Sequence, residues 1–227
     1  MAYYYRNTSG TFTDLTLNGN IDMNANYLNF TGSASPDYQV EDNNGWKDIL
    51  GSPVVRGSGS FDPDFANPSF WDSTMRFYEF VGNGPSRREI WFNFHLPHDM
   101  ADGTTFYIHT HFFAPDVSGG SGNVRWIYNY YHANAMGAPS SEDIFNTSAD
   151  IANSTTTVDT ANKHYISETA ELTLSRAGVD GFICVRLVRD PADASDTFGD
   201  DVYLIGCDVH YNTNKLTTKN KAYPFYS

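Results

Sequence analysis

The chain has 227 residues, of which 40% are hydrophobic, 15% aromatic and 18% charged. This is enough apolar material for a packed core, which excludes a disordered chain. The formal net charge is −13, and a negative surface repels phosphate, so the composition argues against nucleic-acid and membrane partners. No stretch reaches the ~18 apolar residues of a membrane span, and the first residues carry no apolar signal region. We therefore expect a soluble protein that is made in a cytoplasm.

The first part of the chain predicts an attachment segment. Between Thr11 and Phe30, apolar residues are separated by Asn, Gly, Asp and Thr, as in short strands, and Asn18-Gly19 is a strong hairpin signal. A lone hairpin is marginal in water, so we expect this segment to be stabilised by identical copies from other chains. A turn-rich passage follows, and residues 1–55 are interpreted as a stalk or docking segment with a linker. The predicted stalk residues are Leu15, Leu17, Ile21, Met23 and Leu28.

Residues 56–227 are predicted to form one all-β domain, a jelly roll or β-sandwich. Apolar and aromatic residues alternate along several segments, which is typical of a sheet with one buried face. Cys184 and Cys207 fall in two of these segments, either as buried thiols or as a disulfide. The polar stretch 142–160 is interpreted as a long loop with at most one short helix. The predicted strands are 89–95, 104–113, 124–132, 165–174, 181–189 and 202–211.

Two histidines on one predicted strand carry the densest chemistry. His109 and His111 are two residues apart, so both imidazoles face the same side of the sheet at ~7 Å. Gly103 precedes them and Asp116 follows, and this pattern partly resembles the first cupin motif. The resemblance implies a site for iron, manganese or zinc at His109, His111 and Asp116 in a jelly roll.

The sequence departs from that motif. The carboxylate is Asp rather than Glu, and no second cupin motif follows. Two other interpretations therefore remain open. The imidazoles pack with aromatic residues such as Tyr107 and Phe113 and hydrogen-bond to the backbone or to Asp99, or they hold a structural ion or lie at a subunit interface.

The sequence predicts no enzyme and no catalytic residues. It contains no Gly-x-Ser-x-Gly elbow, Walker loop or dinucleotide fingerprint. The acidic stretch 190–201 is interpreted as a solvated loop, with at most a weak calcium site, because carboxylates on a flexible loop rarely keep the spacing that glycosidases need. We expect no cofactor beyond a structural metal ion.

Three segments resemble a domain that recurs in virion proteins of tailed bacteriophages. They are WFNFHLPHDMADGTTFYIHTHFF, VRWIYNYYHA and IGCDVHYNTNK with the final YPFY, and the resemblance covers roughly residues 70–227. Proteins of this kind are structural or fibre-like, so the resemblance implies a place on the virion rather than a reaction. The matched residues are His95, Pro97, His98, Asp99, Gly103, Thr104, His109, His111, Asp208, His210 and Tyr211.

The resemblance implies a non-enzymatic protein on the virion exterior. The amino-terminal segment is similar to repeats of trimeric phage fibres, so we expect a homotrimer. The chain is short for a complete tail fibre, which favours a capsid decoration (cement) protein or short head fibre bound to the major capsid protein or another virion protein. The residues expected to contact the shell are Tyr3, Tyr4, Tyr5 and Phe12.

Two alternatives belong to other classes of protein. One is a tail fibre or receptor-binding protein that recognises a host surface glycan through the loops 115–123 and 135–160. The other is a cupin-like metalloenzyme that uses His109, His111 and Asp116. The position on the particle separates the first from a decoration protein, and the metal content of the purified protein tests the second.

Overall fold

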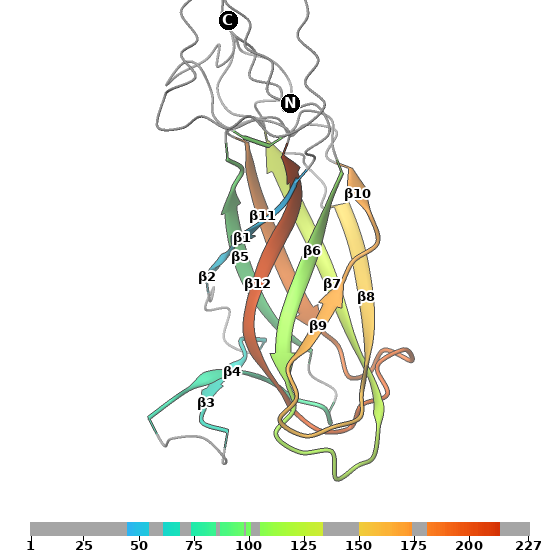
Figure 1. Cartoon of the computed structure of the whole chain (residues 1–227). Helices are drawn as coiled ribbons and strands as arrows, with labels where there is room; N and C mark the ends of the chain where they lie inside the picture. The colour runs from blue at the N-terminus through green and yellow to red at the C-terminus, as the bar shows by residue number, and fades with distance from the viewer. Residues whose placement is uncertain are drawn as a thin grey trace, which may run out of the picture. The chain divides into compact units, whose positions relative to one another are not determined.

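The structure is a computed structural model that describes residues 45–54, 61–68, 74–84, 87–97, 99–100, 105–133, 150–173 and 181–213. All of them belong to one compact unit, residues 37–227. Their regular structure is entirely β, in two antiparallel sheets that pack face to face (Figure 1). The described ranges hold no helix of the length and apolarity that a membrane crossing requires. The chain is therefore an all-β sandwich, as the sequence predicts.

The seven-stranded sheet is built around the last long strand. This strand pairs with β6 along one edge and with β1 and β4 along the other, while β9 and β10 cover the far edge of β6. The strands are β1 (Gly45–Leu50), β3 (Asp64–Ala66), β4 (Phe77–Phe80), β6 (Thr105–Phe113), β9 (Tyr165–Glu168), β10 (Leu172–Thr173) and β12 (Val202–Thr213).

The five-stranded sheet has the order β2-β5-β11-β7-β8. Within it, β5 and β11 are paired along their full length of eight residues. Together, the orders β5-β11-β7-β8 and β1/β4-β12-β6-β9 are those of a jelly roll, in which the chain crosses repeatedly between the sheets. The strands are β2 (Ser52–Val54), β5 (Arg88–His95), β7 (Gly122–Ala133), β8 (Asp150–Val158) and β11 (Phe182–Arg189).

Two boundaries differ from the prediction. β1 and β2 lie before residue 56, in the stretch assigned to the linker, and they pair with β12 and β5 respectively. β8 lies inside the predicted loop 142–160 and pairs with β7 over nine residues. Its inward positions include Ala152 and Ser154, which are small or polar, so their alternation gives little apolar signal.

The core lies between the sheets and is rich in aromatic rings. On β6 the buried face is Phe106, Ile108, Thr110 and Phe112, and on β7 it includes Trp126 and Tyr128. The Phe112 ring meets the Trp126 ring edge-on at 5.5 Å, a favourable geometry for aromatic pairs. The alternation predicted for both strands is therefore confirmed.

The two cysteines lie in different sheets. Cys184 is on β11 and Cys207 is on β12. They do not form the disulfide that the sequence left open. Burial raises the pKa of the Cys207 thiol well above its usual range, so this side chain behaves as a small buried apolar group.

A β-bulge divides β12 into two halves. The register with β6 shifts between Leu204 and Gly206, leaving Ile205 as an extra residue. Before the bulge the even-numbered Val202 and Leu204 belong to the hydrophobic core, and after it the odd-numbered Cys207, Val209 and Tyr211 do. The extra residue therefore turns the even-numbered positions of the second half, beginning with Asp208, to the outer face.

A chain of hydroxyl groups crosses the buried interior. The Tyr128 hydroxyl lies 2.9 Å from Thr110 Oγ1 and 2.9 Å from Ser154 Oγ. Ser154 Oγ in turn lies 2.7 Å from Ser167 Oγ, which also accepts a hydrogen bond from Thr156. Burial raises the pKa of Tyr128 far above its usual range, so its hydroxyl stays protonated and ties both sheets together.

Candidate functional site

The candidate site lies on the outer face of the seven-stranded sheet, where β6 and β12 run side by side. His109 and His111 alternate with buried core residues of β6 and so both face outward. His109 pairs with Asp208 across the ladder, and His111 pairs with Gly206. Because Gly206 has no side chain, His111 reaches diagonally over it to Asp208.

Asp208 lies between the two imidazoles. Its Oδ2 atom is 2.5 Å from His111 Nε2, and its Oδ1 atom is 3.3 Å from His109 Nδ1. The other ring nitrogens also have partners. His109 Nε2 donates to Glu168 Oε2 at 2.7 Å, and His111 Nδ1 lies 2.9 Å from His164 Nε2. Side chains of β6, β12 and β9, together with His164 just before β9, therefore form one connected polar group.

The carboxylate of Asp208 is strongly ionised. Burial opposes its ionisation, but the approach of His109 and His111 outweighs burial and lowers the pKa of Asp208 to about 2. The contact with Asp208 raises the pKa of His109, against burial, and Glu168 adds to the increase. Burial and the nearby His111 lower the pKa of His164. The group therefore combines an ionised carboxylate with one imidazole whose pKa is raised, that of His109, and one whose pKa is lowered, that of His164.

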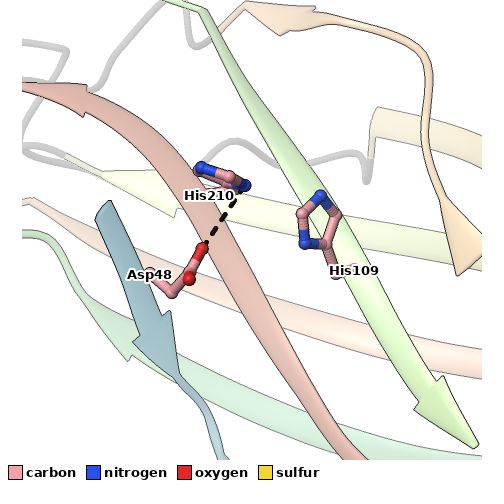
Figure 2. A group of neighbouring side chains, drawn as sticks. All are labelled: Asp48, His109 and His210. Carbon is pink, nitrogen blue, oxygen red and sulfur yellow. Dashed lines mark ion pairs between the residues drawn. The ribbon is translucent and has the colours of Figure 1, made fainter. Parts of the chain in front are cut away.

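A second group on this face consists of Asp48 of β1, His210 of β12 and, again, His109 (Figure 2). Asp48 Oδ1 lies 3.4 Å from His210 Nδ1, and the His109 ring meets the His210 ring edge-on at 5.0 Å. Ligand atoms of Asp48, His109 and His210 lie within 4.8 Å of one another, as do those of His109, His111 and Asp208. His109 therefore belongs to two groups with metal-ligand chemistry.

The carboxylate that lies beside His109 and His111 is Asp208, not the predicted Asp116. Asp116 is exposed in the turn after β6, and its Oδ1 accepts a hydrogen bond from the Val117 N–H. It belongs to neither group of close ligand atoms among the described residues. Asp208 takes its place because β12 is the hydrogen-bonded neighbour of β6.

The aromatic interpretation is also corrected. Phe113 stacks on Tyr203 with ring centroids 5.5 Å apart, and Asp99 accepts a hydrogen bond from the Tyr211 hydroxyl at 3.0 Å. The two imidazoles instead contact Asp208, Glu168, His164 and His210.

Several predicted residues lie outside the described residues. This holds for His98, Gly103 and Thr104 of the resembling motif. It holds equally for the predicted shell-contact residues Tyr3, Tyr4, Tyr5 and Phe12, and for the predicted stalk residues Leu15, Leu17, Ile21, Met23 and Leu28.

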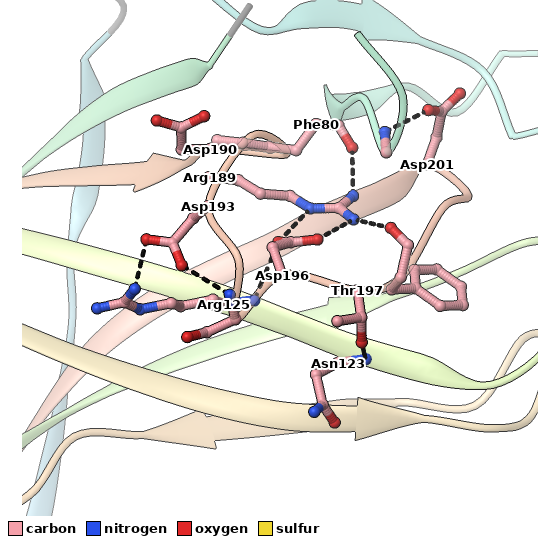
Figure 3. Close-up of polar contacts among 12 residues, drawn as sticks. Phe80, Asn123, Arg125, Arg189, Asp190, Asp193, Asp196, Thr197 and Asp201 are labelled. Atoms are coloured by element: carbon pink, nitrogen blue, oxygen red, sulfur yellow. Dashed lines mark hydrogen bonds and ion pairs between the residues drawn. The ribbon is translucent and has the colours of Figure 1, made fainter. Parts of the chain in front are cut away.

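The acidic stretch 190–201 is organised around a buried arginine (Figure 3). Arg189 is 0% exposed and forms two hydrogen bonds of 3.0 Å with the Asp196 carboxylate. Its remaining N–H groups donate to the backbone oxygens of Phe80, Asp200 and Phe198. A buried charge must be paired in this way, and the loop is folded around that pairing rather than solvated.

The other carboxylates of this loop have structural partners too. Asp193 pairs with Arg125, and its other oxygen accepts from the Ser195 N–H at 2.8 Å. Asp200 accepts from the Gly119 N–H at 3.0 Å, and Asp201 accepts from the Gly82 N–H at 2.8 Å. These carboxylates join the loop to neighbouring turns, which accounts for them without a calcium ion.

Comparison with known proteins gives little. No protein-family model matches the chain, and no curated protein matches it. One similar solved structure is TmCBM61 in complex with β-1,4-galactotriose, with 9% sequence identity and a TM-score of 0.27. The match covers 78% of this chain and 97% of that chain. At this distance the likeness assigns neither a ligand nor a function to this chain.

Proposed function

We propose that this chain is a non-enzymatic structural protein on the exterior of a tailed-phage virion. In this proposal the jelly roll is the head of a homotrimer, and the amino-terminal segment attaches it to the major capsid protein or another virion protein. The observation that carries the proposal concerns the residues of the phage resemblance. Several of those that the structure describes, among them Asp99, His109 and His111, contact neighbouring strands.

Asp99 is the best example. Its carboxylate accepts a hydrogen bond from the Tyr211 hydroxyl at 3.0 Å and pairs with Lys47 of β1. Its backbone oxygen accepts from the Thr213 hydroxyl at 2.6 Å. The turn after β5 is therefore tied to β12 and β1 by one residue of the motif. These contacts between strands support a structural role for Asp99.

The histidines of the motif fit the same interpretation. All four ring nitrogens of His109 and His111 lie within 3.3 Å of a polar atom of Asp208, Glu168 or His164, within the protein itself. A general base needs a free lone pair directed at a substrate. Side chains committed to neighbouring strands support a scaffold rather than a hydrolytic centre.

Cryo-electron microscopy of the particle that contains this chain tests the proposal. Density at three-fold or quasi-three-fold positions over the whole shell, with a copy number near that of the shell protein, is expected for a decoration protein. Sedimentation of the purified full chain is expected to give a trimer. Absence of the chain from the particle would overturn the virion proposal, and density confined to the tail would move it to the receptor-binding alternative.

Glycan recognition is the second candidate, favoured by one exposed aromatic pair. Trp46 is 46% exposed on β1, and its ring lies 5.5 Å from Tyr107 and 5.2 Å from His210. An exposed aromatic face beside carboxylates such as Asp48 suits a sugar ring, which presents C–H groups and hydroxyls.

A glycan microarray probed with the full chain tests this candidate. Trp46→Ala is expected to abolish the strongest signals. Phe65→Ala is the matched control, because Phe65 is 55% exposed on β3, which lies beyond β4 at the other end of β12. Signals that survive Trp46→Ala, or that both variants lose equally, would remove this face as the glycan site.

A further inference from the structure

The outer face of β6 and β12 holds two imidazoles and one carboxylate around a common point. The ligand atoms of His109, His111 and Asp208 all lie within 4.8 Å of one another. A Zn²⁺ ion with ligands at about 2.0–2.1 Å in tetrahedral geometry keeps its ligand atoms roughly 3.3 Å apart. The separation of His109 Nδ1 and Asp208 Oδ1 is already 3.3 Å. The 2.5 Å contact of His111 Nε2 with Asp208 Oδ2 must lengthen.

Asp208 carries an unused acceptor at this point. Its residue is 6% exposed, and its Oδ1 atom is buried without a hydrogen-bond partner in the part of the chain that the structure describes. His109 Nδ1 is near this atom but not aligned to donate to it. A buried carboxylate oxygen without a partner is costly, and a cation bound between the two groups would satisfy it.

The far nitrogens of both rings are held as in metal sites. His109 Nε2 donates to Glu168, which directs the His109 Nδ1 lone pair toward Asp208. His111 Nδ1 lies 2.9 Å from His164 Nε2 and can donate its proton there, leaving the Nε2 lone pair for an ion. Metal-binding histidines almost always have such a partner on the second nitrogen, and it fixes the tautomer and the ring orientation.

We propose that His109, His111 and Asp208 form a Zn²⁺ site, with Glu168 and His164 as the positioning residues behind the two imidazoles. Two imidazole nitrogens and one carboxylate oxygen suit Zn²⁺, and the fourth position opens to solvent, since the His111 side chain is 21% exposed. The ion would join β6 to β12 from outside the core. This inference stands whether or not the chain belongs to a virion.

The alternative group, Asp48 with His109 and His210, is less suited to an ion. The Asp48 side chain is 62% exposed, so water already solvates it. The two groups share His109, which makes Asp48 a useful control. A variant at Asp48 removes a neighbouring carboxylate and leaves the proposed ligand set complete.

The test uses the full chain, freed of metal by dialysis against EDTA. Zinc affinity is measured by competition with a chromophoric chelator, and metal content is measured by mass spectrometry after gel filtration. We expect one Zn²⁺ per chain in the wild type. Asp208→Asn and His111→Gln are expected to lose at least ~10-fold in affinity, and Glu168→Gln is expected to lose affinity ~10-fold through the His109 orientation. Asp48→Asn is expected to bind as the wild type does.

Each other outcome overturns the proposal. Metal-free wild-type protein that takes up no Zn²⁺ means that the Asp208 pairings are purely internal. Binding that survives both Asp208→Asn and His111→Gln places the ion elsewhere, and binding that only Asp48→Asn abolishes assigns it to the second group. If buried Asp208→Asn fails to fold, the partly exposed His111→Gln decides, with circular dichroism confirming the fold of each variant.

Discussion

Arg189 and Asp196 form a buried ion pair with two parallel hydrogen bonds of 3.0 Å, from Nε to Oδ2 and from Nη2 to Oδ1. Removal of the charge in Asp196→Asn leaves the Arg189 guanidinium buried with only carbonyl partners and an amide. Breaking such a pair costs about 3–5 kcal/mol of the free energy of unfolding. Urea denaturation of the full chain measures this loss.

The control for that experiment is Asp190→Asn in the same loop. Asp190 accepts a hydrogen bond from the Ala192 N–H at 3.0 Å but lies outside the buried pair. We expect a loss of about 0.5 kcal/mol or less. Equal losses in the two variants would contradict the central position of Arg189.

Asp193 predicts a measurable effect of acid on stability. The hydrogen bond from Arg125, followed by that from the Ser195 N–H, lowers the pKa of Asp193 below its ordinary value. A carboxyl with a lowered pKa in the folded state adds stability above its unfolded pKa, and this is lost as the pH falls through the folded value. For a partly exposed pair the amount is about 0.2–1 kcal/mol.

The variant Asp193→Asn is expected to be less stable than the wild type at neutral pH and to approach it at the acid end. Urea unfolding at a series of pH values gives both curves. A difference between the curves that stays constant, or grows, as the pH falls would contradict the assignment.

Tyr128→Phe removes the central hydroxyl of the buried chain. Thr110 Oγ1 of β6 then loses its 2.9 Å partner on β7, and this link between the two sheets is broken, while the contact of Ser154 with Ser167 remains. A buried polar atom left without its partner costs about 1–3 kcal/mol. Thermal and urea unfolding measure the loss, and Tyr131→Phe on the outward face of β7 is the control. A Tyr128→Phe protein as stable as this control would show that the hydroxyl chain contributes nothing.

Gly122→Ala is expected to displace the acidic loop. A Cβ at Gly122 would lie 2.6 Å from the backbone oxygen of Thr197 and 2.8 Å from the Cα of Phe198. Backbone atoms at this distance must move, and such crowding costs about 1–3 kcal/mol. Gly119→Ala is the matched control, because its Cβ would meet only side-chain atoms of Asp200, the nearest at 3.4 Å, which is ordinary contact. Proteolysis within 190–201 should increase in Gly122→Ala alone.

Alternation along the sequence predicts the strands whose inner positions are all apolar. Ile90, Phe92 and Phe94 of β5 are at most 1% exposed, and this face is visible in the sequence. β1 is different, because it covers the edge of β12 with mostly exposed side chains. Its place in the sheet follows from pairing with a strand more than 150 residues away in the chain, which local patterns do not encode.

The same limit explains the candidate site. His109 and His111 lie on one strand, so their common face follows from the two-residue period. Asp208 is 97 residues from His111. Steps of two from the buried Val202 would place Asp208 in the core, and only the bulge at Ile205 turns it outward. This backbone irregularity cannot be predicted from alternation, so the sequence favours the nearby Asp116 instead of Asp208.

Because of the bulge, even-numbered residues face the core in the first half of β12 and odd-numbered residues face it in the second half. The half before Ile205 pairs with β4, the half after it pairs with β1, and β6 pairs with both halves. A single-residue deletion that removes the bulge would force one half to exchange its faces, turning either Asp208 and His210 toward the core or Val202 and Leu204 toward the outer face. We therefore expect a deletion of Ile205 to be disruptive although its side chain is 48% exposed, because the residue sets which faces of β12 point inward.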